Sequence, residues 1–275
     1  MSTIIPRYTD RLVNTSDFWL EVSRGSFDDM YMVLKFGTNP DCATGVWELI
    51  ANLSATAPYP FPTTPTTVRI KAGGNAADAS GGAGARTLRI VGIDENLNEV
   101  TEDLTFNADG TLASASTTTT FWRVYRAYVL TTGTYGGDNT GAVVVENTAG
   151  TADLLRIEAG GGQTRLLSFS VPLGWTAYFM GFEVHVDSTK PADIRVRHRE
   201  NFNQTSAPYS PIREIFFEAG IAGGSQNLAN APLGIIPALS DIWIEARGAG
   251  ANTVVSGAME ILMIADEDVT ITTSN

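Results

Sequence analysis

The sequence predicts an all-β protein, with two β-sandwich (jelly-roll-like) domains preceded by an extended N-terminal arm. Short runs of β-branched and aromatic residues recur along the chain, separated by Gly, Pro, Asn, Asp and Thr. Apolar residues show no helical period over a useful length. Only 17% of the 275 residues are charged, which is typical of β-rich extracellular or particle-bound proteins.

Residues 1–44 form the predicted arm. This stretch is too apolar for a solvated tail, since it contains Phe18, Trp19, Tyr31 and Phe36. It shows no sustained period, so one long helix is not predicted. We expect an extended segment that docks on another protein surface. The alternative is a segment that packs on its own domain.

Residues 45–160 form the first predicted sandwich, and residues 161–275 form the second. A glycine-rich stretch at 160–162 marks the boundary between them. The strands expected in the first sandwich are 46–51, 66–72, 86–93, 99–106, 121–130, 141–147 and 153–159. Those expected in the second are 164–174, 175–187, 193–200, 212–220, 241–248, 254–266 and 269–273. Large apolar residues line both faces of 175–187 and 254–266, so we expect these strands to be covered on both sides.

The glycine-rich tract 72–84 does not match a phosphate-binding loop. A P-loop needs a lysine and a hydroxyl directly after its last glycine, at the start of a helix. Here Gly84 is followed by Ala85 and Arg86, and an aliphatic run typical of a strand comes next. The tract is therefore predicted to be a loop between strands.

The acidic stretch that follows does not match a calcium-binding loop. Asp94, Asn96 and Asn98 occupy the first three ligand positions of an EF-hand pattern. Glu99 stands where that pattern requires glycine, and Thr105 stands where it requires glutamate. Residues 94–98 are instead predicted to form a hairpin turn.

Composition predicts neither a cofactor nor a metal site. Cys42 is the one cysteine, and His185 and His198 are the two histidines. These three residues are too few for a zinc site of the usual type. No G-x-S-x-G motif accompanies the histidines, so a serine-based catalytic triad is not predicted. We predict no catalytic, metal-binding or cofactor-binding residue.

The charge pattern bears on possible partners. The net charge of −12 repels phosphate, so nucleic acid is not an expected partner. No apolar stretch is long enough for a membrane span, so no membrane partner is expected. Arg195, Arg197 and Arg199 alternate along the predicted strand 193–200. We expect them to pair across strands or across subunits.

Three motifs carry a resemblance to a known family. The first is KFG-x-N-x-D, the second GAR followed by G-x-D, and the third TYGG-x-N-x-G. Their residues are Lys35, Phe36, Gly37, Asn39 and Asp41; Gly84, Ala85, Arg86, Gly92 and Asp94; and Tyr135, Gly136, Gly137, Asn139 and Gly141. With them the chain resembles tailed-phage virion structural proteins of marine and environmental phages. The resemblance implies a virion component that is not an enzyme.

The leading hypothesis is a capsid-decorating (cement) protein on the capsid exterior. It would bind the major capsid protein and copies of itself as a homo-oligomer, expected to be a trimer, and would stabilise the capsid. The residues expected to form the interface, in the arm and its motif, are Trp19, Arg24, Tyr31, Lys35, Phe36, Gly37, Asn39 and Trp47. Within the same class, a neck, tail or fibre component of the virion is the alternative.

Two other classes stay open. A carbohydrate-binding β-sandwich module could use exposed aromatic rings as a sugar platform. The candidate rings are Trp122, Tyr135, Trp175 and Trp243. A glycosidase would need two carboxylates at a fixed separation. The candidates are Glu158, Glu183, Asp193, Glu214 and Glu245.

Overall fold

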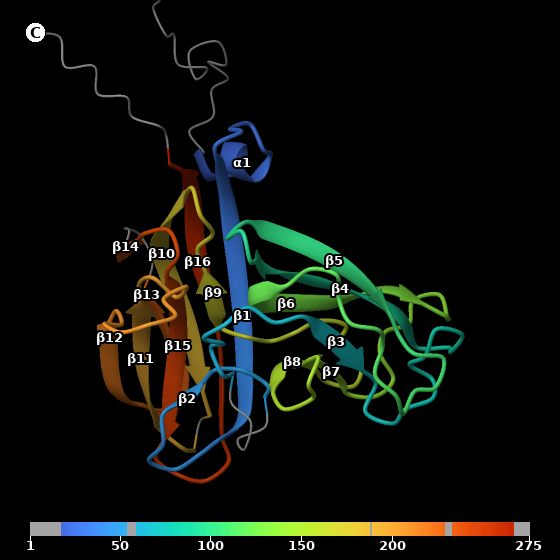
Figure 1. The fold of residues 1–275 in the computed structure, drawn as a ribbon. Helices are drawn as coiled ribbons and strands as arrows, with labels where there is room; N and C mark the ends of the chain where they lie inside the picture. The colour runs from blue at the N-terminus through green and yellow to red at the C-terminus, as the bar shows by residue number, and fades with distance from the viewer. Residues whose placement is uncertain (1–17, 54–58, 188, 229–232, 267–275) are drawn as a thin grey trace, which may run out of the picture.

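The computed structural model describes residues 18–53, 59–187, 189–228 and 233–266. Within these ranges the chain is all-β, as predicted, and forms two lobes of antiparallel sheets (Figure 1). The described helix, α1 (Phe18–Ser23), is a short one next to the first strand. No helix in the described ranges is long and apolar enough to cross a membrane.

The larger lobe contains two five-stranded sheets. The first has the order β1-β16-β10-β13, and β14 also pairs with β10. Its strands are β1 (Met30–Cys42), β16 (Thr253–Ala265), β10 (Trp175–Val186), β13 (Gly224–Leu228) and β14 (Gly234–Ile236). The long central strands β10 and β16 each have a strand on both sides.

The second sheet of this lobe has the order β12-β11-β15-β2, and β9 also pairs with β15. Its strands are β12 (Ile212–Ile221), β11 (Ala192–Arg199), β15 (Asp241–Gly248), β2 (Glu48–Leu49) and β9 (Ser168–Ser170). Buried residues such as Ile194 and Val196 alternate along β11 with partly exposed arginines, because successive side chains of a strand point to opposite faces. The rings of Phe182 on β10 and Phe216 on β12 lie 5.0 Å apart between the two sheets.

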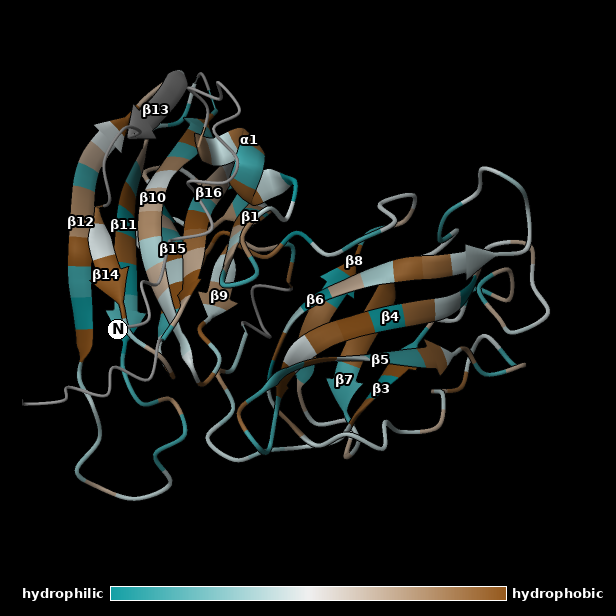
Figure 2. Cartoon of the chain, turned by 90° about the horizontal axis from the view of Figure 1, so that it is seen from above, coloured by the Kyte–Doolittle hydropathy of each residue, from teal (hydrophilic) through white to brown (hydrophobic). Residues whose placement is uncertain are grey.

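The smaller lobe contains two three-stranded sheets. Their strands are β3 (Val68–Lys71), β7 (Val143–Asn147) and β8 (Asp153–Ile157) in one, and β5 (Glu99–Thr105), β4 (Ala85–Asp94) and β6 (Phe121–Thr132) in the other. The hairpin predicted at residues 94–98 is confirmed, because β4 and β5 pair directly on either side of it. Figure 2 shows hydrophobic and hydrophilic segments alternating along the strands of both lobes. Ile70, Ile90 and Val145 are buried in the core.

Strands occur at the positions predicted between residues 46 and 266. The strand predicted at 269–273 lies outside the described residues. The prediction missed β1, β13 and β14. The sequence predicts no strand between 220 and 241, but β13 lies there and its backbone pairs with β10.

The predicted arm needs a correction. Residues 1–17 lie outside the described residues, but Met30–Cys42 is β1 and pairs with β16 along its length. These backbone hydrogen bonds place the second half of the expected arm inside a sheet of its own chain. An arm that reaches another protein can therefore include only residues before Met30.

Strand pairing also bears on the expected domain boundaries. Through β1 and β2, residues 30–49 share sheets with strands from residues 168–265. The boundary expected at residue 44 thus falls inside the larger lobe. The smaller lobe is inserted between β2 and β9. The boundary expected near residue 160 lies between β8 and β9 and stays a prediction.

Candidate functional site

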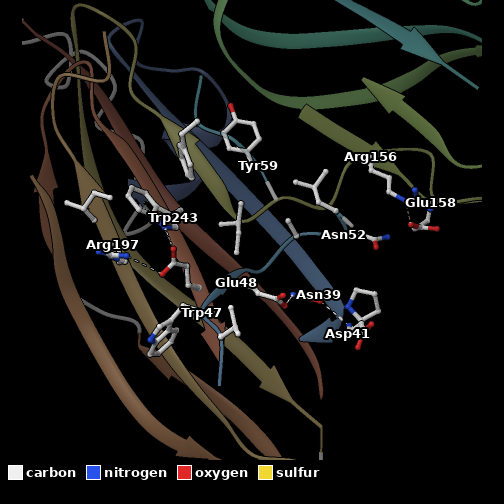
Figure 3. Close-up of a pocket in the computed structure, with 18 residues that line it drawn as sticks. Asn39, Asp41, Trp47, Glu48, Asn52, Tyr59, Arg156, Glu158, Arg197 and Trp243 are labelled. Atoms are coloured by element: carbon white, nitrogen blue, oxygen red, sulfur yellow. Dashed lines mark hydrogen bonds and ion pairs between the residues drawn. The ribbon is translucent and has the colours of Figure 1, made fainter. Parts of the chain in front are cut away.

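A cleft of about 690 Å³ opens between the two lobes (Figure 3). Four aromatic residues line it: Trp47, Tyr59, Phe61 and Trp243. Its walls come from the chain around β2, from β11 and β15 of the larger lobe, and from the end of β8 in the smaller lobe. The cleft thus combines segments that are far apart in the sequence.

Trp47 lies among guanidinium groups. The guanidinium carbon of Arg195 is 4.1 Å from the centre of the Trp47 ring, and that of Arg247 is 4.7 Å from it. The ring of Phe217 packs edge-on against it at 6.1 Å. Cation–π contacts of this kind hold a ring in one orientation. Trp47 is therefore a fixed part of the cleft wall.

Glu245 connects the arginines to the second indole. Its carboxylate accepts hydrogen bonds from Arg195 Nε at 2.5 Å and from Trp243 Nε1 at 2.8 Å. The Arg197 Nη1 atom lies 3.7 Å from the same carboxylate, and Arg197 Nε is buried without a hydrogen-bond partner. Cross-strand pairing of this arginine row, which the sequence predicted, is confirmed for Arg195 and Glu245.

Polar side chains form the rest of the wall. Glu48 accepts hydrogen bonds from the Asn39 amide and from the Ala43 backbone N–H, both at 3.0 Å. Across the cleft, Arg156 Nε donates to Glu158 at 2.6 Å. These carboxylates already accept hydrogen bonds from the protein, an arrangement suited to binding and positioning rather than to proton transfer.

Metal binding has no geometric support in the part of the chain that the structure describes. There, His, Cys, Asp and Glu side chains form no group of three that could hold an ion. His185 lies 3.2 Å from Glu183, and burial lowers the pKa of His198. Cys42 is buried, and burial raises the pKa of its thiol to about 11.

The residues expected at the interface are not brought together. Trp19 is exposed on α1, and Arg24 follows the helix and pairs with Glu21. Tyr31 packs edge-on against Trp175 with ring centres 4.9 Å apart, and Phe36 is partly buried on β1. An interface role stays a prediction for these four residues.

The remaining residues of that set make contacts inside the chain. Lys35 is 6% exposed and Asn39 is 7% exposed, so neither offers a surface to a partner. Gly37 is buried, and a Cβ added there would lie 2.2 Å from the carbonyl oxygen of Ile50. Trp47 lines the cleft. The motif of residues 35–41 thus holds β1 in place within this chain.

The proposed sugar platform does not form one surface. Trp122 is buried against Phe202, while Tyr135 is fully exposed on a loop of the smaller lobe. Trp175 packs on Tyr31, and Trp243 lines the cleft. Of the carboxylates considered for catalysis, Glu158 and Glu245 line the cleft. Among the others, Asp193 pairs with Arg247, and Arg195 lies 4.0 Å from Glu214.

The glycine-rich tract binds a carboxylate of its own chain. Asp78 is fully buried and accepts hydrogen bonds from the backbone N–H groups of Ala85, Thr140 and Gly141 at 2.7–2.9 Å. A Cβ on Gly84 would lie 2.2 Å from this carboxylate. Backbone donors that could hold a phosphate are therefore already satisfied, and the tract is a structural loop.

The loop carrying the TYGG motif joins the same cluster. The amide of Asn139 is fully buried and donates to the carbonyl oxygens of Gly141 and Glu158 at 2.7 and 2.6 Å. Its oxygen accepts from the Gly162 N–H at 2.9 Å. Sequence reasoning quoted these motifs but missed Asp78. The sequence feature that could have indicated it is a single acidic residue, Asp78, within a run of small residues.

Sequence reasoning also missed most of the cleft. Tyr59 and Phe61 lie in the proline-rich stretch between the predicted strands 46–51 and 66–72, and no motif surrounds Asn52. The alternation of aromatic residues with proline in that stretch was the signal available. Proline restricts the backbone, so it can hold neighbouring rings in place.

Comparison with known proteins gives a weak likeness to structures of virus particles. No family model matches the chain, and no curated protein matches it. T=1 particles derived from infectious bursal virus match with 10% identity, 86% coverage of this chain, 70% coverage of that chain and a TM-score of 0.25. The VP2 subviral particle of infectious bursal disease virus matches with 10% identity, 87% and 73% coverage and a TM-score of 0.23. Scores this low leave the function to be argued from the residues.

Proposed function

We propose that this chain is a structural protein of a virus particle and acts through surface contacts, without catalysing a reaction. Within this class we propose a capsid-decorating protein on the capsid exterior, bound to the major capsid protein. The resemblance of its three motifs to tailed-phage virion proteins supports this class. A neck, tail or fibre position is the alternative within it.

The observation that carries the proposal is the apolar surface of α1. Phe18 is 43% exposed and Trp19 is 44% exposed, and their rings pack edge to face with centres 5.0 Å apart. Exposed aromatic residues that lie together mark interaction surfaces more often than chance. We define Phe18 and Trp19 as the α1 patch.

A second surface supports self-association. β12 is an edge strand that pairs on one side with β11, as far as the described ranges go. Ile212, Ile215 and Phe217 are each more than one-third exposed on it. Exposed apolar edges favour pairing with another chain. A head-to-tail contact between this edge and a different surface of the next copy gives a ring, such as a trimer, when the rotation from copy to copy closes.

Copy number in purified virus particles tests the position. A decorating protein is expected in numbers comparable to the major capsid protein, measured by quantitative mass spectrometry. A small fixed number would place the chain at the neck, tail or fibre. Absence from purified particles would overturn the proposed class.

Binding to particles that lack this chain tests the α1 patch. The two variants delete residues 1–17 or replace both Phe18 and Trp19 with serine, and both changes lie outside every described strand. Each ring is less than half exposed, so covering the exposed part contributes about 1 kcal/mol per ring. A variant with serine at both positions should therefore bind roughly thirtyfold more weakly. Tyr135→Ser is the matched control, because Tyr135 is a fully exposed aromatic residue in the other lobe. Equal binding by all variants would rule out docking through this patch.

A further inference from the structure

The cleft between the lobes has the size and preformed walls of a ligand-binding site. Its volume of about 690 Å³ falls within the range of about 300–1,000 Å³ that is usual for such sites. Its aromatic rings contact one another and charged groups of the protein. The Phe61 ring lies 4.8 Å from the rings of Tyr59 and Trp243. A ligand entering the cleft would therefore have few side chains to order.

The backbone at Phe61 is strained in a way that positions its ring. Phe61 has a φ of +46°, in the left-handed region that bulky residues rarely adopt. A conformation of this kind costs about 1–3 kcal/mol and is concentrated at binding sites. The surrounding contacts hold it, since the guanidinium carbons of Arg123 and Arg199 lie 6.0 and 5.8 Å from the Phe61 ring. The strained residue contributes directly to the cleft wall.

The charges that line the cleft favour a ligand without negative charge. Four carboxylates line it, those of Asp41, Glu48, Glu158 and Glu245, against the two guanidinium groups of Arg156 and Arg197. Arg195 and Arg247 lie behind the Trp47 ring and offset part of this negative charge. The lining therefore favours a neutral or positively charged ligand over phosphate, sulfate or an acidic sugar.

The hydrogen-bonding groups in the cleft favour a neutral ligand that can both donate and accept hydrogen bonds. The carboxylates accept hydrogen bonds, the Asn52 amide both donates and accepts, and the Arg197 guanidinium donates. Arg197 makes one long ion pair, at 3.7 Å to Glu245. The charged side chains of a basic peptide offer only donors, so it would meet Asn52 and Arg197 only through its backbone carbonyl groups. A sugar hydroxyl donates and accepts, and the apolar face of a sugar ring can pack on an aromatic ring.

We propose that this cleft binds a neutral saccharide, packed against the partly exposed rings of Trp47 and Phe61 and hydrogen-bonded by Asn52 and Arg197. The ring set differs from the platform considered from sequence, because Trp47 and Phe61 replace Trp122, Tyr135, Trp175 and Trp243. This binding activity goes beyond the structural role proposed above. It would attach a surface-located protein to a neutral glycan.

The test is a binding screen on the full chain, followed by titration. A glycan array presents neutral, sialylated and uronic-acid oligosaccharides side by side. Tryptophan fluorescence then follows titration with the neutral oligosaccharide that binds best, and with hexa-arginine as the basic peptide. We expect binding to neutral glycans with a change in fluorescence, because two indoles line the cleft.

Two variants locate the site. Asn52→Ala removes one hydrogen-bonding side chain from a partly exposed position, and is expected to weaken binding about tenfold. Phe61→Ala removes a ring and should weaken it further. Tyr135→Ala is the control and should bind as the unmodified protein does. Thermal unfolding of each variant identifies any that fails to fold, and Asn52→Ala makes no core cavity.

Four outcomes would overturn the inference. They are no neutral glycan bound on the array, binding only of acidic glycans, binding only of hexa-arginine, and unchanged affinity in Asn52→Ala with a folded protein. None of these bears on particle copy number, so the structural role and the saccharide site succeed or fail separately.

Discussion

Arg123 on β6 and Asp241 on β15 form a fully buried ion pair that joins the two lobes. Arg123 Nε and Nη2 each donate to one carboxylate oxygen of Asp241 at 2.9 Å, and neither side chain is exposed. Asp241 also accepts from Ser170 at 2.7 Å and from Arg199 at 2.8 Å. Burial alone would raise the pKa of Asp241, but its partners outweigh burial and lower that pKa.

Breaking this pair is expected to destabilise the protein strongly. Arg123→Met leaves a buried carboxylate with only part of its compensation, which typically costs about 3–5 kcal/mol. Urea unfolding measures the loss as a shift of the midpoint at constant slope. Arg123→Met combined with Asp241→Leu removes both charges, and should lose less than the sum of the single changes. Additive losses would contradict direct coupling of the two lobes through this pair.

Lys35 makes a second contact between the lobes, and its pKa predicts a pH dependence. Its Nζ donates to the carbonyl oxygen of Tyr125 at 2.5 Å and lies 5.3 Å from the centre of that ring. The Tyr125 hydroxyl in turn donates to Glu99 at 2.6 Å. Burial, and then the charge of Arg126, lower the pKa of Lys35 to about 7, against the opposing effect of Glu99.

The direction in which stability changes with pH follows from the proton that Lys35 takes up on unfolding. Lysine in the unfolded chain has a pKa of about 10.4, so above pH 7 the unfolded state binds more protons than the folded state. Stability should therefore rise with pH from about 7 to about 9 through this group. Above that range tyrosines in the unfolded chain lose their protons. Burial raises the pKa of Tyr125 in the folded protein, so a further rise in pH lowers the stability through this group.

Comparing urea midpoints of the unmodified protein and Lys35→Met from pH 6 to about 9 tests this expectation. The unmodified protein should gain stability relative to the variant as pH rises. Lys71→Met is the control, because Lys71 is exposed at the end of β3 and its removal should leave the slope unchanged. Parallel curves for the unmodified protein and Lys35→Met would mean that Lys35 does not lose its proton in this range.

Gly37 is expected to tolerate no side chain. A Cβ there would lie 2.2 Å from the carbonyl oxygen of Ile50 and 2.8 Å from the Cβ of Leu167, so β1 and its neighbours would have to separate. Overpacking of this kind costs about 1–3 kcal/mol, and contact with backbone places Gly37→Ala at the upper end. Gly81→Ala is the matched control, since open space surrounds Gly81. Thermal unfolding of both variants measures the difference, and equal melting temperatures would contradict close packing at Gly37.

The course of β1 explains what sequence reasoning could and could not predict. Strands such as β11 alternate apolar and polar residues over a half-buried sheet, so their pattern alone predicted them. β1 buries Lys35, Gly37 and Asn39, which are polar or small, so its sequence shows no apolar alternation. Its partner β16 is at the other end of the described chain. No local pattern carries information about such a pairing.

The sequence did not predict the cleft for a related reason. Trp47 and Trp243 are far apart in the sequence, and the pairing of β2 with β15 brings their segments to one wall of the cleft. Arginine pairing within the β11 row was predictable because residues two apart on a strand share a face. The register between β11 and β15 decides which carboxylate lies opposite each arginine, as Glu245 lies opposite Arg195. Turn geometry and the hydrophobic pattern set that register when the sheet folds.

Asp78 gives the last prediction, on the loops at the outer end of the smaller lobe. Its Oδ1 accepts from the N–H groups of Ala85 and Thr140, and its Oδ2 accepts from that of Gly141. Asp78→Ala leaves buried donors unpaired and should cost about 3 kcal/mol. Asp78→Asn retains an acceptor oxygen but places an amide N–H₂ against one donor, so it should lose an intermediate amount.

Asp109→Ala is the control for this series. Asp109 also accepts a backbone hydrogen bond, from Thr111 at 2.9 Å, but it is exposed, so its loss should cost less stability than the loss of Asp78. Urea unfolding ranks the three variants, and hydrogen exchange at Thr140 and Gly141 reports whether the loop opens first. A folded Asp78→Ala protein as stable as Asp109→Ala would mean that water replaces the carboxylate without cost, and that the glycine-rich tract keeps its shape without an internal anion.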